Sequence, residues 1–439
     1  MKVLHLCLSA FYIDGYGYQE NILPRMHKKL GYDVLIVAST ETYIDNMNLG
    51  YIESRNYVNE DGIPVHRIPY LKYIPARIVH KLRIYEGLYK ELGTFSPDVI
   101  FMHDFQFLSI RTVGKYMKKN TSVKLFVDGH ADFKNSARSF ISKWVLHSII
   151  YKYCVNLIIP YTEQFYGTLP SRVRFFVDFY GTPKSKTSFL PMGADDYLVE
   201  KAKKSGQREV IRDKYGIKED EFLIVTGGKF NKKKSEVLNL LKAVRELDRK
   251  YKVRLLIFGS LEEGDFRHAF DTLCDNDIIQ YVGWIKGDQS YDYFEASDIV
   301  VFPGLHSVLW EQAVGQGKPC IFNYMEGFTH VDIGGNCLFI DNKDDVQELK
   351  NKIIESIMSY DSIYESSSSK GMSYFSYLDI AKRAIAFRNS SHSFKFSLIY
   401  SINCFASSGN SPRIRFAYPN VILFFVPLTG IAWISPCPF

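Results

Sequence analysis

The sequence has few of the features that would identify a protein class at once. Its seven cysteines form no CxxC pair and have no histidine at zinc-binding spacing, so we expect reduced, buried thiols rather than a disulfide framework or a metal site. The first residues lack the apolar stretch and cleavage site of a signal peptide, and we interpret them as a strand. Before residue 419 no segment approaches ~20 uninterrupted apolar residues, so any membrane contact of the main body should be peripheral.

Acidic residues are absent after Asp379, and this absence decides what the net charge means. The 439 residues include 54 Lys plus Arg and 48 Asp plus Glu, which gives a formal charge of +6. The excess comes from the basic residues of the C-terminal segment, which are Lys382, Arg383, Arg388, Lys395, Arg413 and Arg415. The chain up to Asp379 is therefore neutral, and this argues against a nucleic-acid partner.

Short apolar segments alternate with helical patterns along most of the chain. The first series of expected strands covers 3–8, 34–38, 99–102, 123–127 and 157–160, and the second covers 222–226, 253–258, 278–282, 299–302 and 320–322. Helical patterns lie between them, for example at 20–30, 235–250 and 308–316. This alternation predicts parallel sheets with both faces covered. Because the two series are separated by a more polar region, we expect two tandem doubly wound α/β domains.

Ligands in such folds bind beyond the carboxyl ends of the strands, so the loops there are the candidate sites. The loop after the first strand contains Gly15 and Gly17 just before a helix that begins near Tyr18. Glycines let the backbone approach a ligand, and a helix N-terminus offers N–H groups to an anion. A tight turn explains the same residues equally well. Neither GxGxxG nor GxxxxGK[ST] occurs, which disfavours dinucleotide and Walker-type sites.

A second candidate loop follows the first strand of the second series, at 226–235. It contains Gly228, and Lys229 and Lys234 lie on either side of the expected helix start. Two ammonium groups and a helix N-terminus could converge on one diphosphate. The alternative is a solvated run of lysines on the surface.

A third candidate loop, at 302–313, again lies between a strand and a helix. Glu311 comes about one turn into that helix, where its carboxylate could accept hydrogen bonds from two adjacent hydroxyls, as a ribose presents them. An exposed, solubilising glutamate is the alternative.

In their order and spacing these loops resemble those of GT-B glycosyltransferases, specifically the retaining family 4 group, which uses nucleotide-sugar donors. The resemblance covers about residues 1–388. The matching pieces are the glycine loop, Gly129-His130, segment 190–195, Gly228-Lys229 with Lys234, and Glu311 followed by Gly317-Lys318-Pro319. It implies two Rossmann-like domains facing a cleft, at 1–195 for the acceptor and 196–360 for the nucleotide sugar, with a C-terminal helix at 361–388 crossing back.

The resemblance also implies a role for each matching residue. Lys229 and Lys234 would bind the diphosphate, and with His130 near the transferred sugar they form the expected catalytic set. Glu311 would hold the ribose and the backbone around Trp284 the base. The complete set of expected donor-binding residues is Gly15, Gly17, Gly228, Trp284, Leu305, His306, Ser307, Val308 and Glu311. The nucleotide sugar is a substrate, so no cofactor is expected.

One departure from the family pattern concerns the donor sugar. The family has a second glutamate eight positions before the ribose glutamate, and this position is Pro303. Sugar recognition would then depend on His306, Ser307 and loop amides.

A non-catalytic assembly partner and a nucleotide-sugar epimerase are the alternative functions. Because no DxD-type cluster lies in a suitable loop, we expect no metal.

We expect the sugar acceptor to bind the first domain. Segments 72–90 and 138–152 mix apolar residues with Arg and Lys at helical spacing, which suits an anionic membrane surface and a lipid-linked acceptor. Core helices with a basic rim are the alternative. By family analogy, we expect a cytoplasmic enzyme of bacterial surface polysaccharide assembly, such as capsule or lipopolysaccharide, at the inner face of the plasma membrane.

Segment 389–439 has no regular pattern, and we interpret it as a disordered or out-of-frame tail, with a membrane-surface anchor as the alternative.

Overall fold

A computed structural model describes residues 1–9, 11–44, 48–130, 142–233, 235–247 and 249–386. The chain separates into two units, Met1–Phe387 and Arg388–Phe439, and the described residues all belong to the first. The predicted tail at 389–439 and the candidate Lys234 therefore lie outside the described residues. The same is true of the first part of segment 138–152.

The first half of the described chain is built on an eight-stranded sheet with the order β10-β9-β8-β7-β1-β2-β6-β5. Its neighbouring strands are parallel, apart from the antiparallel pair of β5 and β6. The strands are β1 (Lys2–Cys7), β2 (Asp33–Ser39), β5 (Arg55–Val58), β6 (Pro64–Ile68), β7 (Val99–His103), β8 (Lys124–Gly129), β9 (Thr162–Gly167) and β10 (Thr187–Phe189). A separate antiparallel pair consists of β3 (Glu41–Tyr43) and β4 (Leu49–Tyr51).

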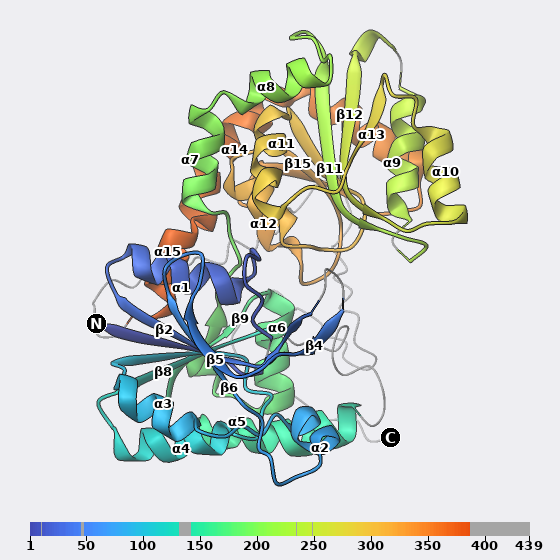
Figure 1. Ribbon diagram of the computed structural model, residues 1–439. Helices are drawn as coiled ribbons and strands as arrows, with labels where there is room; N and C mark the ends of the chain where they lie inside the picture. The colour runs from blue at the N-terminus through green and yellow to red at the C-terminus, as the bar shows by residue number, and fades with distance from the viewer. Residues whose placement is uncertain (10, 45–47, 131–141, 234, 248, 387–439) are drawn as a thin grey trace, which may run out of the picture. The chain divides into compact units, whose positions relative to one another are not determined.

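Helices cover both faces of this sheet, with α1 on one face and α3, α4 and α5 on the other (Figure 1). The helices are α1 (Gln19–Lys29), α2 (Ala76–Leu82), α3 (Leu88–Phe95), α4 (Ile110–Lys119), α5 (Lys152–Ile158) and α6 (Pro170–Phe175). Shorter π and 3₁₀ segments are Ser142–Tyr151, Phe176–Tyr180 and Lys184–Lys186. This double cover explains why the central strands are apolar on both faces.

The second half contains a six-stranded parallel sheet with the order β13-β12-β11-β14-β15-β16. The strands are β11 (Phe222–Phe230), β12 (Val253–Leu261), β13 (Ile279–Gly283), β14 (Ile299–Phe302), β15 (Cys320–Asn323) and β16 (Cys337–Ile340). The helices are α7 (Asp196–Lys204), α8 (Gln207–Lys214), α9 (Glu236–Arg245), α10 (Asp265–Leu273), α11 (Ser290–Ala296), α12 (Leu309–Gly315), α13 (Val346–Met358), α14 (Tyr360–Phe375) and α15 (Tyr377–Ala384). The 3₁₀ turns are Arg249–Tyr251, Gly287–Gln289 and Thr329–Val331.

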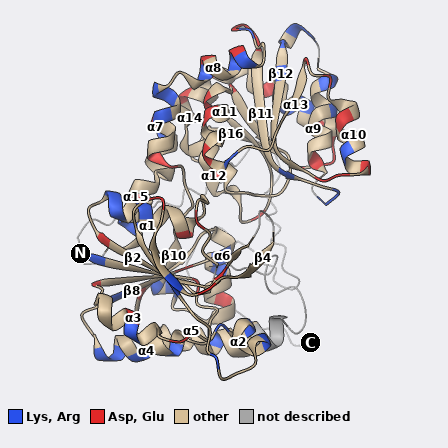
Figure 2. Ribbon diagram, viewed as in Figure 1, with Lys and Arg blue, Asp and Glu red and all other residues tan. Residues whose placement is uncertain are grey.

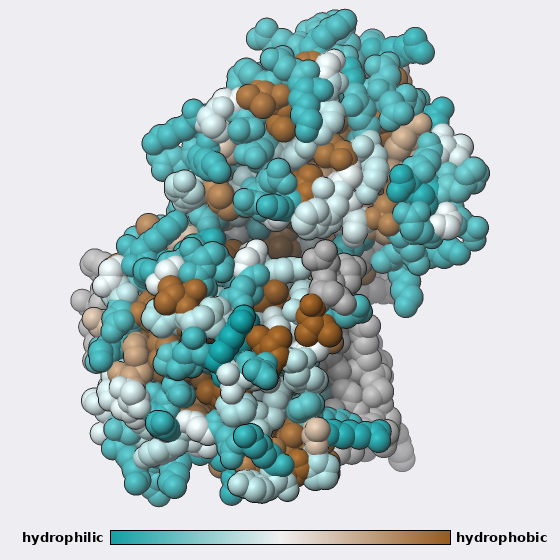
Figure 3. All heavy atoms as spheres, in the orientation of Figure 1, coloured by the Kyte–Doolittle hydropathy of each residue, from teal (hydrophilic) through white to brown (hydrophobic). Residues whose placement is uncertain are grey.

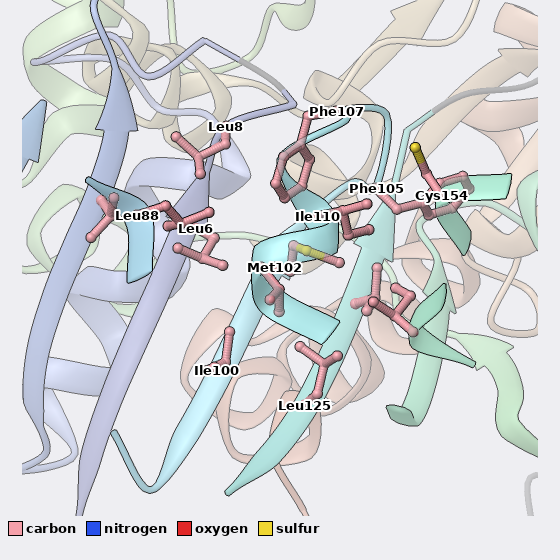
Figure 4. Packing of buried hydrophobic residues seen from close by; sticks show 14 of the residues in the cluster. Leu6, Leu8, Leu88, Ile100, Met102, Phe105, Phe107, Ile110, Leu125 and Cys154 are labelled. Atoms are coloured by element: carbon pink, nitrogen blue, oxygen red, sulfur yellow. The ribbon is translucent and has the colours of Figure 1, made fainter. Parts of the chain in front are cut away.

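Alternate residues of β1 serve two different cores. Leu4 and Leu6, with Leu8 just after the strand, belong to the cluster beneath α3, α4 and α5 that also contains Ile100, Met102 and Phe105. Figure 4 shows Leu6 and Leu8 in this cluster. Val3 faces the opposite cluster, which α1 and α15 supply. Burying such side chains contributes about 1.5–3 kcal/mol each relative to exposure. His5 lies on the same face as Val3, so a polar residue occupies the core under α1.

The last two helices join the second half of the chain to the first. Helix α14 packs on α12, whereas α15 packs on α1. Between them, Ser376 leaves the helical conformation, and its hydroxyl accepts a hydrogen bond from the N–H of Asp379 at 3.2 Å. A short bridge ties this junction to Ala194, whose N–H donates to Phe375 O at 2.7 Å and whose carbonyl accepts from Tyr377 N–H at 3.0 Å.

The expectation of two tandem α/β halves with parallel sheets is confirmed, but three local predictions are wrong. Leu157 and Ile158 end α5, and the strand follows at Thr162–Gly167; Leu157, Ile158 and Ile159 pack into the hydrophobic core of the first half. Strand β11 continues to Phe230, so the first part of segment 226–235 is strand rather than loop. Segment 361–388 is not one helix, because Ser376 separates α14 from α15.

Gly193 provides a test of the junction between α14 and α15. A Cβ atom at this position would lie 2.3 Å from Phe375 O and 2.6 Å from Ile380 Cδ1. We expect Gly193→Ala to destabilise the fold by roughly 1–3 kcal/mol through overpacking, seen as a lower midpoint of thermal unfolding. Gly93→Ala is the control, because a Cβ there has no atom within 4 Å and alanine favours helix α3. Equal losses in both variants would contradict this account of the junction.

Candidate functional site

A cavity of about 230 Å³ lies at the carboxyl end of β1, where the chain enters α1. Its lining residues are Phe11, Gly17, Tyr18, Gln19, Glu20, His130, Met192 and Val308. Three of these, Gly17, His130 and Val308, were predicted as site residues from separate parts of the sequence. The fold therefore brings the glycine loop, the residue after β8 and the β14–α12 loop to one cavity.

The N-terminus of α1 forms one wall of the cavity. The N–H groups of Asn21 and Ile22 both donate to Tyr18 O, and the amide of Asn21 donates to Ile13 O at 2.8 Å, which holds the preceding loop. Gly15 has a φ of +75°, a conformation that favours glycine, but it does not line the cavity. Its N–H donates to Glu60 Oε1 at 2.7 Å. The structure thus places Gly17, rather than Gly15, where a ligand would meet this loop.

Asp128 lies behind His130 at the end of β8. Its side chain is fully buried, and Oδ2 accepts a hydrogen bond from Gln19 Nε2 at 3.0 Å. His130 Nε2 is 3.9 Å from the same oxygen. Burial favours the protonated acid, but His103 and His130 outweigh it and hold the pKa of Asp128 well below its usual range. In turn, burial opposes the charged form of His130, whereas Asp128 raises its pKa overall.

In the second half, Gly228 and Lys229 lie on β11, opposite Gly259 and Ser260 of β12. A Cβ on Gly259 would lie 1.9 Å from Gly228 O, so glycine there serves the close approach of two strands. The ammonium of Lys229 is exposed and has no hydrogen-bond or ion-pair partner among the described residues. It is free to meet a ligand, in contrast to Lys232, whose ammonium lies 3.2 Å from Asp265.

Glu311 is fully buried in α12 and is held by two histidines. His306 Nε2 donates to Glu311 Oε1 at 2.9 Å and His330 Nε2 donates to the same oxygen at 2.8 Å. Burial alone would raise the pKa of Glu311, but the two histidines lower it to about 2. The second oxygen, Oε2, is buried and has no partner within the described part of the chain. The alternative of an exposed, solubilising glutamate is therefore wrong.

Two residues near this loop were missed from the sequence. His330 belongs to the 3₁₀ turn after β15, and because β14 and β15 are parallel neighbours, their carboxyl ends place His306 and His330 together. Glu236, the first residue of α9, is buried and paired with Lys343 at 2.6 Å. A Cβ on Gly304 would lie 3.2 Å from Glu236 Oε2, so a carboxylate lies beside the residue that follows Pro303.

The remaining predicted donor residues lie on the surface or at the start of α12. Trp284 is 71% exposed and Leu305 is 52% exposed, so both offer apolar side chains to a ligand. Ser307 accepts the N–H of Trp310 with its carbonyl and thereby begins the helix. None of these three lines the cavity.

The three ligand atoms of His306, Glu311 and His330 lie within 4.8 Å of one another, a grouping that a metal ion could also use. Tetrahedral zinc ligands at about 2.0–2.1 Å from the ion would lie roughly 3.3 Å apart. The observed nitrogen-to-oxygen distances of 2.9 and 2.8 Å are shorter and match direct hydrogen bonds. The geometry therefore favours histidine N–H groups, not an ion, as the partners of Glu311.

Comparisons with known proteins bear on the whole arrangement. Residues 207–366 match the family model described as Glycosyl transferases group 1. No curated protein sequence matches the chain. Among solved structures, sucrose-phosphate synthase from Thermosynechococcus elongatus is 14% identical, with a TM-score of 0.58 over 87% of this chain and 96% of that one. HepE from Anabaena, solved with UDP, is 15% identical, with a TM-score of 0.61 over 87% and 98%.

A third solved structure, WaaG, is described as a glycosyltransferase involved in lipopolysaccharide biosynthesis. It is 12% identical, with a TM-score of 0.57 over 87% of this chain and all of that one. At such identities the likeness shows the fold, which these proteins and this chain share along nearly their full length. The family match adds an independent finding for the second half of the chain.

The hydrogen bonds to Glu311 generate a prediction about metal. We expect the purified protein to contain less than one tenth of a zinc ion per chain, and we expect added zinc to leave its unfolding temperature unchanged, since the carboxylate already has two N–H donors. Elemental analysis and thermal unfolding with and without chelator measure both. One zinc per chain that disappears in His330→Ala, while His268→Ala retains it, would contradict the prediction. His268 is the control because it is exposed on α10.

Proposed function

We propose that the chain, which shares its fold with solved glycosyltransferases and matches the group 1 glycosyltransferase model over residues 207–366, moves a hexose from a nucleoside-diphosphate donor to a glycan or lipid-linked acceptor. The observation that carries this proposal is the cavity, where Gly17, His130 and Val308 meet. A cavity of about 230 Å³ suits a single sugar ring with part of its phosphate. We propose retention of configuration, on the resemblance to family 4.

In the proposed reaction, the bond between the anomeric carbon and the donor phosphate oxygen breaks while the acceptor oxygen forms its bond on the same face. Negative charge develops on the leaving diphosphate, and the acceptor proton passes to it. Cations that meet this charge stabilise the transition state more than the ground state. Lys229 suits that role because its ammonium is exposed and unpaired within the described residues. Lys234 is proposed to act with it.

Glu311 is proposed to bind the ribose of the donor. Its Oε1 is already occupied by His306 and His330, so Oε2 remains to accept hydrogen bonds from ribose hydroxyls. With its pKa lowered to about 2, the group is a carboxylate at every physiological pH. A carboxylate oxygen that is buried without a partner is costly, and donor binding would remove that cost. Trp284 offers an exposed ring to the base.

Lys229→Ala is the sharpest test of the donor site. We expect the affinity for a nucleoside diphosphate such as UDP to fall about 10-fold, because a charge-assisted contact to phosphate is lost. Calorimetric titration measures this, and release of nucleoside diphosphate in the presence of acceptor measures turnover. Lys233→Ala is the matched control, since Lys233 is an exposed lysine four residues away on the same segment.

Two outcomes would count against the proposal in different ways. If neither UDP nor another nucleoside diphosphate binds the unmodified protein, the donor site is wrong. If nucleotides bind but no sugar is transferred to any acceptor, the chain is a non-catalytic relative, and the absence of a glutamate at Pro303 would be the first cause to examine.

The acceptor is proposed to meet the first half of the chain near an anionic membrane surface. Exposed basic and apolar side chains gather on and before α2, namely Lys72, Tyr73, Arg77, Ile78 and Lys81. Figure 2 shows Lys and Arg on α2, α3 and α4. On the face seen in Figure 3, apolar residues lie scattered among hydrophilic ones, so contact would depend on charge together with a few inserted side chains.

No described helix is long and apolar enough to cross a membrane. From the exposed basic and apolar side chains on and before α2, we propose peripheral contact at the inner face of the plasma membrane, in the cytoplasm. Surface polysaccharide assembly is the proposed setting, because lipid-linked acceptors occur there and because WaaG, which shares the fold, is involved in lipopolysaccharide biosynthesis.

Reversal of two charges tests the membrane contact. We expect Arg77→Glu with Lys81→Glu to weaken binding to vesicles with anionic lipid by at least about 10-fold, since each basic residue near such a surface contributes about 1 kcal/mol. Vesicle sedimentation measures the bound fraction. Lys203→Glu with Lys242→Glu is the control, because these lysines are exposed on α7 and α9 of the second half. Equal weakening in both double variants would show a non-specific charge effect and refute the site.

A further inference from the structure

Three buried histidines form a continuous hydrogen-bonded chain behind the cavity. They come from α1, β1 and β7, and we call them the histidine chain: His27, His5 and His103. At one end, His27 Nε2 lies 2.9 Å from Ala381 O of α15. Within the chain, His27 Nδ1 lies 2.9 Å from His5 Nε2, and His5 Nδ1 lies 3.0 Å from His103 Nε2. At the other end, His103 Nδ1 lies 3.1 Å from Asp128 Oδ2.

The number of hydrogens in this chain follows from its two ends. A backbone carbonyl and a carboxylate can only accept hydrogen bonds, so both terminal histidines must donate outward. Four hydrogen bonds in a row then need four hydrogens. Three neutral imidazoles carry only one ring hydrogen each. Three neutral histidines and an ionised Asp128 therefore cannot make all four hydrogen bonds.

The burial of these groups also indicates one additional proton. Asp128 and all three histidines are fully buried, and a lone carboxylate in such surroundings is strongly disfavoured. One additional proton makes the group of four neutral. Burial and the neighbouring histidines hold the pKa of His5 far below its usual range, and burial lowers the pKa of His27 to about 4, so these shifts oppose a second additional proton.

We propose that the histidine chain holds one proton beyond its neutral state and that this proton balances the carboxylate of Asp128 behind the cavity residue His130. The proton lies on His103 when His103 donates to both Asp128 and His5, and His5 and His27 donate toward Ala381. It can pass to His5 and then to His27 by shifts along the hydrogen bonds, and each shift leaves all four bonds intact. The carbonyl of Ala381 suits a positive charge at that end, because it belongs to the C-terminal turn of α15.

The role of His130 in sugar transfer rests on the proposed function, whereas the bound proton does not. Because the proton compensates Asp128, the carboxylate attracts a second proton to His130 less strongly. The other charged groups that act on His130 and Asp128 are Glu20 of α1, Asp104 after β7 and Arg172 of α6. The histidine chain is thus a set of positioning residues that governs the charge of His130 from behind.

Nitrogen NMR of the unmodified, full-length chain labelled with ¹⁵N-histidine tests the bound proton directly. We expect one buried histidine to carry hydrogen on both ring nitrogens from pH 6 to pH 9, while exposed histidines lose one over the same range. A protonated Asp128, detected through its carboxyl carbon, or three neutral buried histidines would overturn the proposal. Neither readout depends on sugar transfer, so failure of this proposal and failure of the proposed function are distinguishable.

A matched pair of variants tests the link to His130. In His5→Phe the chain is cut, and the remaining two hydrogen bonds need only two hydrogens, so the additional proton is lost. We expect the pKa of His130 to rise by about 1 in the NMR titration, since Asp128 is no longer compensated. His66→Phe is the control, because His66 is half-buried on β6 and pairs with Glu91 at 2.7 Å, outside the chain. An unchanged His130 titration in folded His5→Phe would overturn the link.

Discussion

The arrangement of the site depends on one constraint: a carboxylate buried away from water must be matched by groups that donate hydrogen bonds or carry positive charge. The chain meets this constraint twice. Asp128 in the first half lies between His103 and His130, and Glu311 in the second half lies between His306 and His330. In both places the histidines keep the acid ionised although burial opposes it. Both carboxylates are therefore fixed anions at physiological pH.

Parallel sheets explain why these groups come together. The carboxyl ends of neighbouring parallel strands meet at one edge, so residues far apart in the sequence become neighbours there. His103 and Asp128 are register partners at the ends of β7 and β8. The loops after β14 and β15 supply His306 and His330 in the same way. The helix α15 adds a contact of another kind, since its carbonyl at Ala381 closes the histidine chain.

The sequence predicted what depends on local pattern and on strand order. Alternation of apolar segments was enough for two parallel α/β halves. The positions after strand ends indicated the loops of Gly17 and Val308, whereas His130 came from the family resemblance, and all three line one cavity. It could not predict partners that only tertiary packing creates. His5 is the polar residue among the buried residues Val3–Cys7 of β1, and nothing local shows that His27 and His103 will lie beside it. His330 was missed for the same reason. The prediction of a strand at 157–160 was wrong because a short apolar segment fits a buried helix turn as well as a strand.

The absence of a glutamate at Pro303 has a structural counterpart in how the nearby carboxylates are occupied. Glu236 lies beside Gly304, but Lys343 takes its Oε1. Glu311 lies on α12, the helix that follows Gly304, but His306 and His330 both donate hydrogen bonds to its Oε1. Each carboxylate thus keeps one oxygen, and neither is free to turn, because a change of orientation would break a short hydrogen bond in a buried site. Under the proposed function, a sugar or ribose would have to fit these oxygens as they stand. Rigid acceptors of this kind would penalise any donor whose hydroxyls are differently placed.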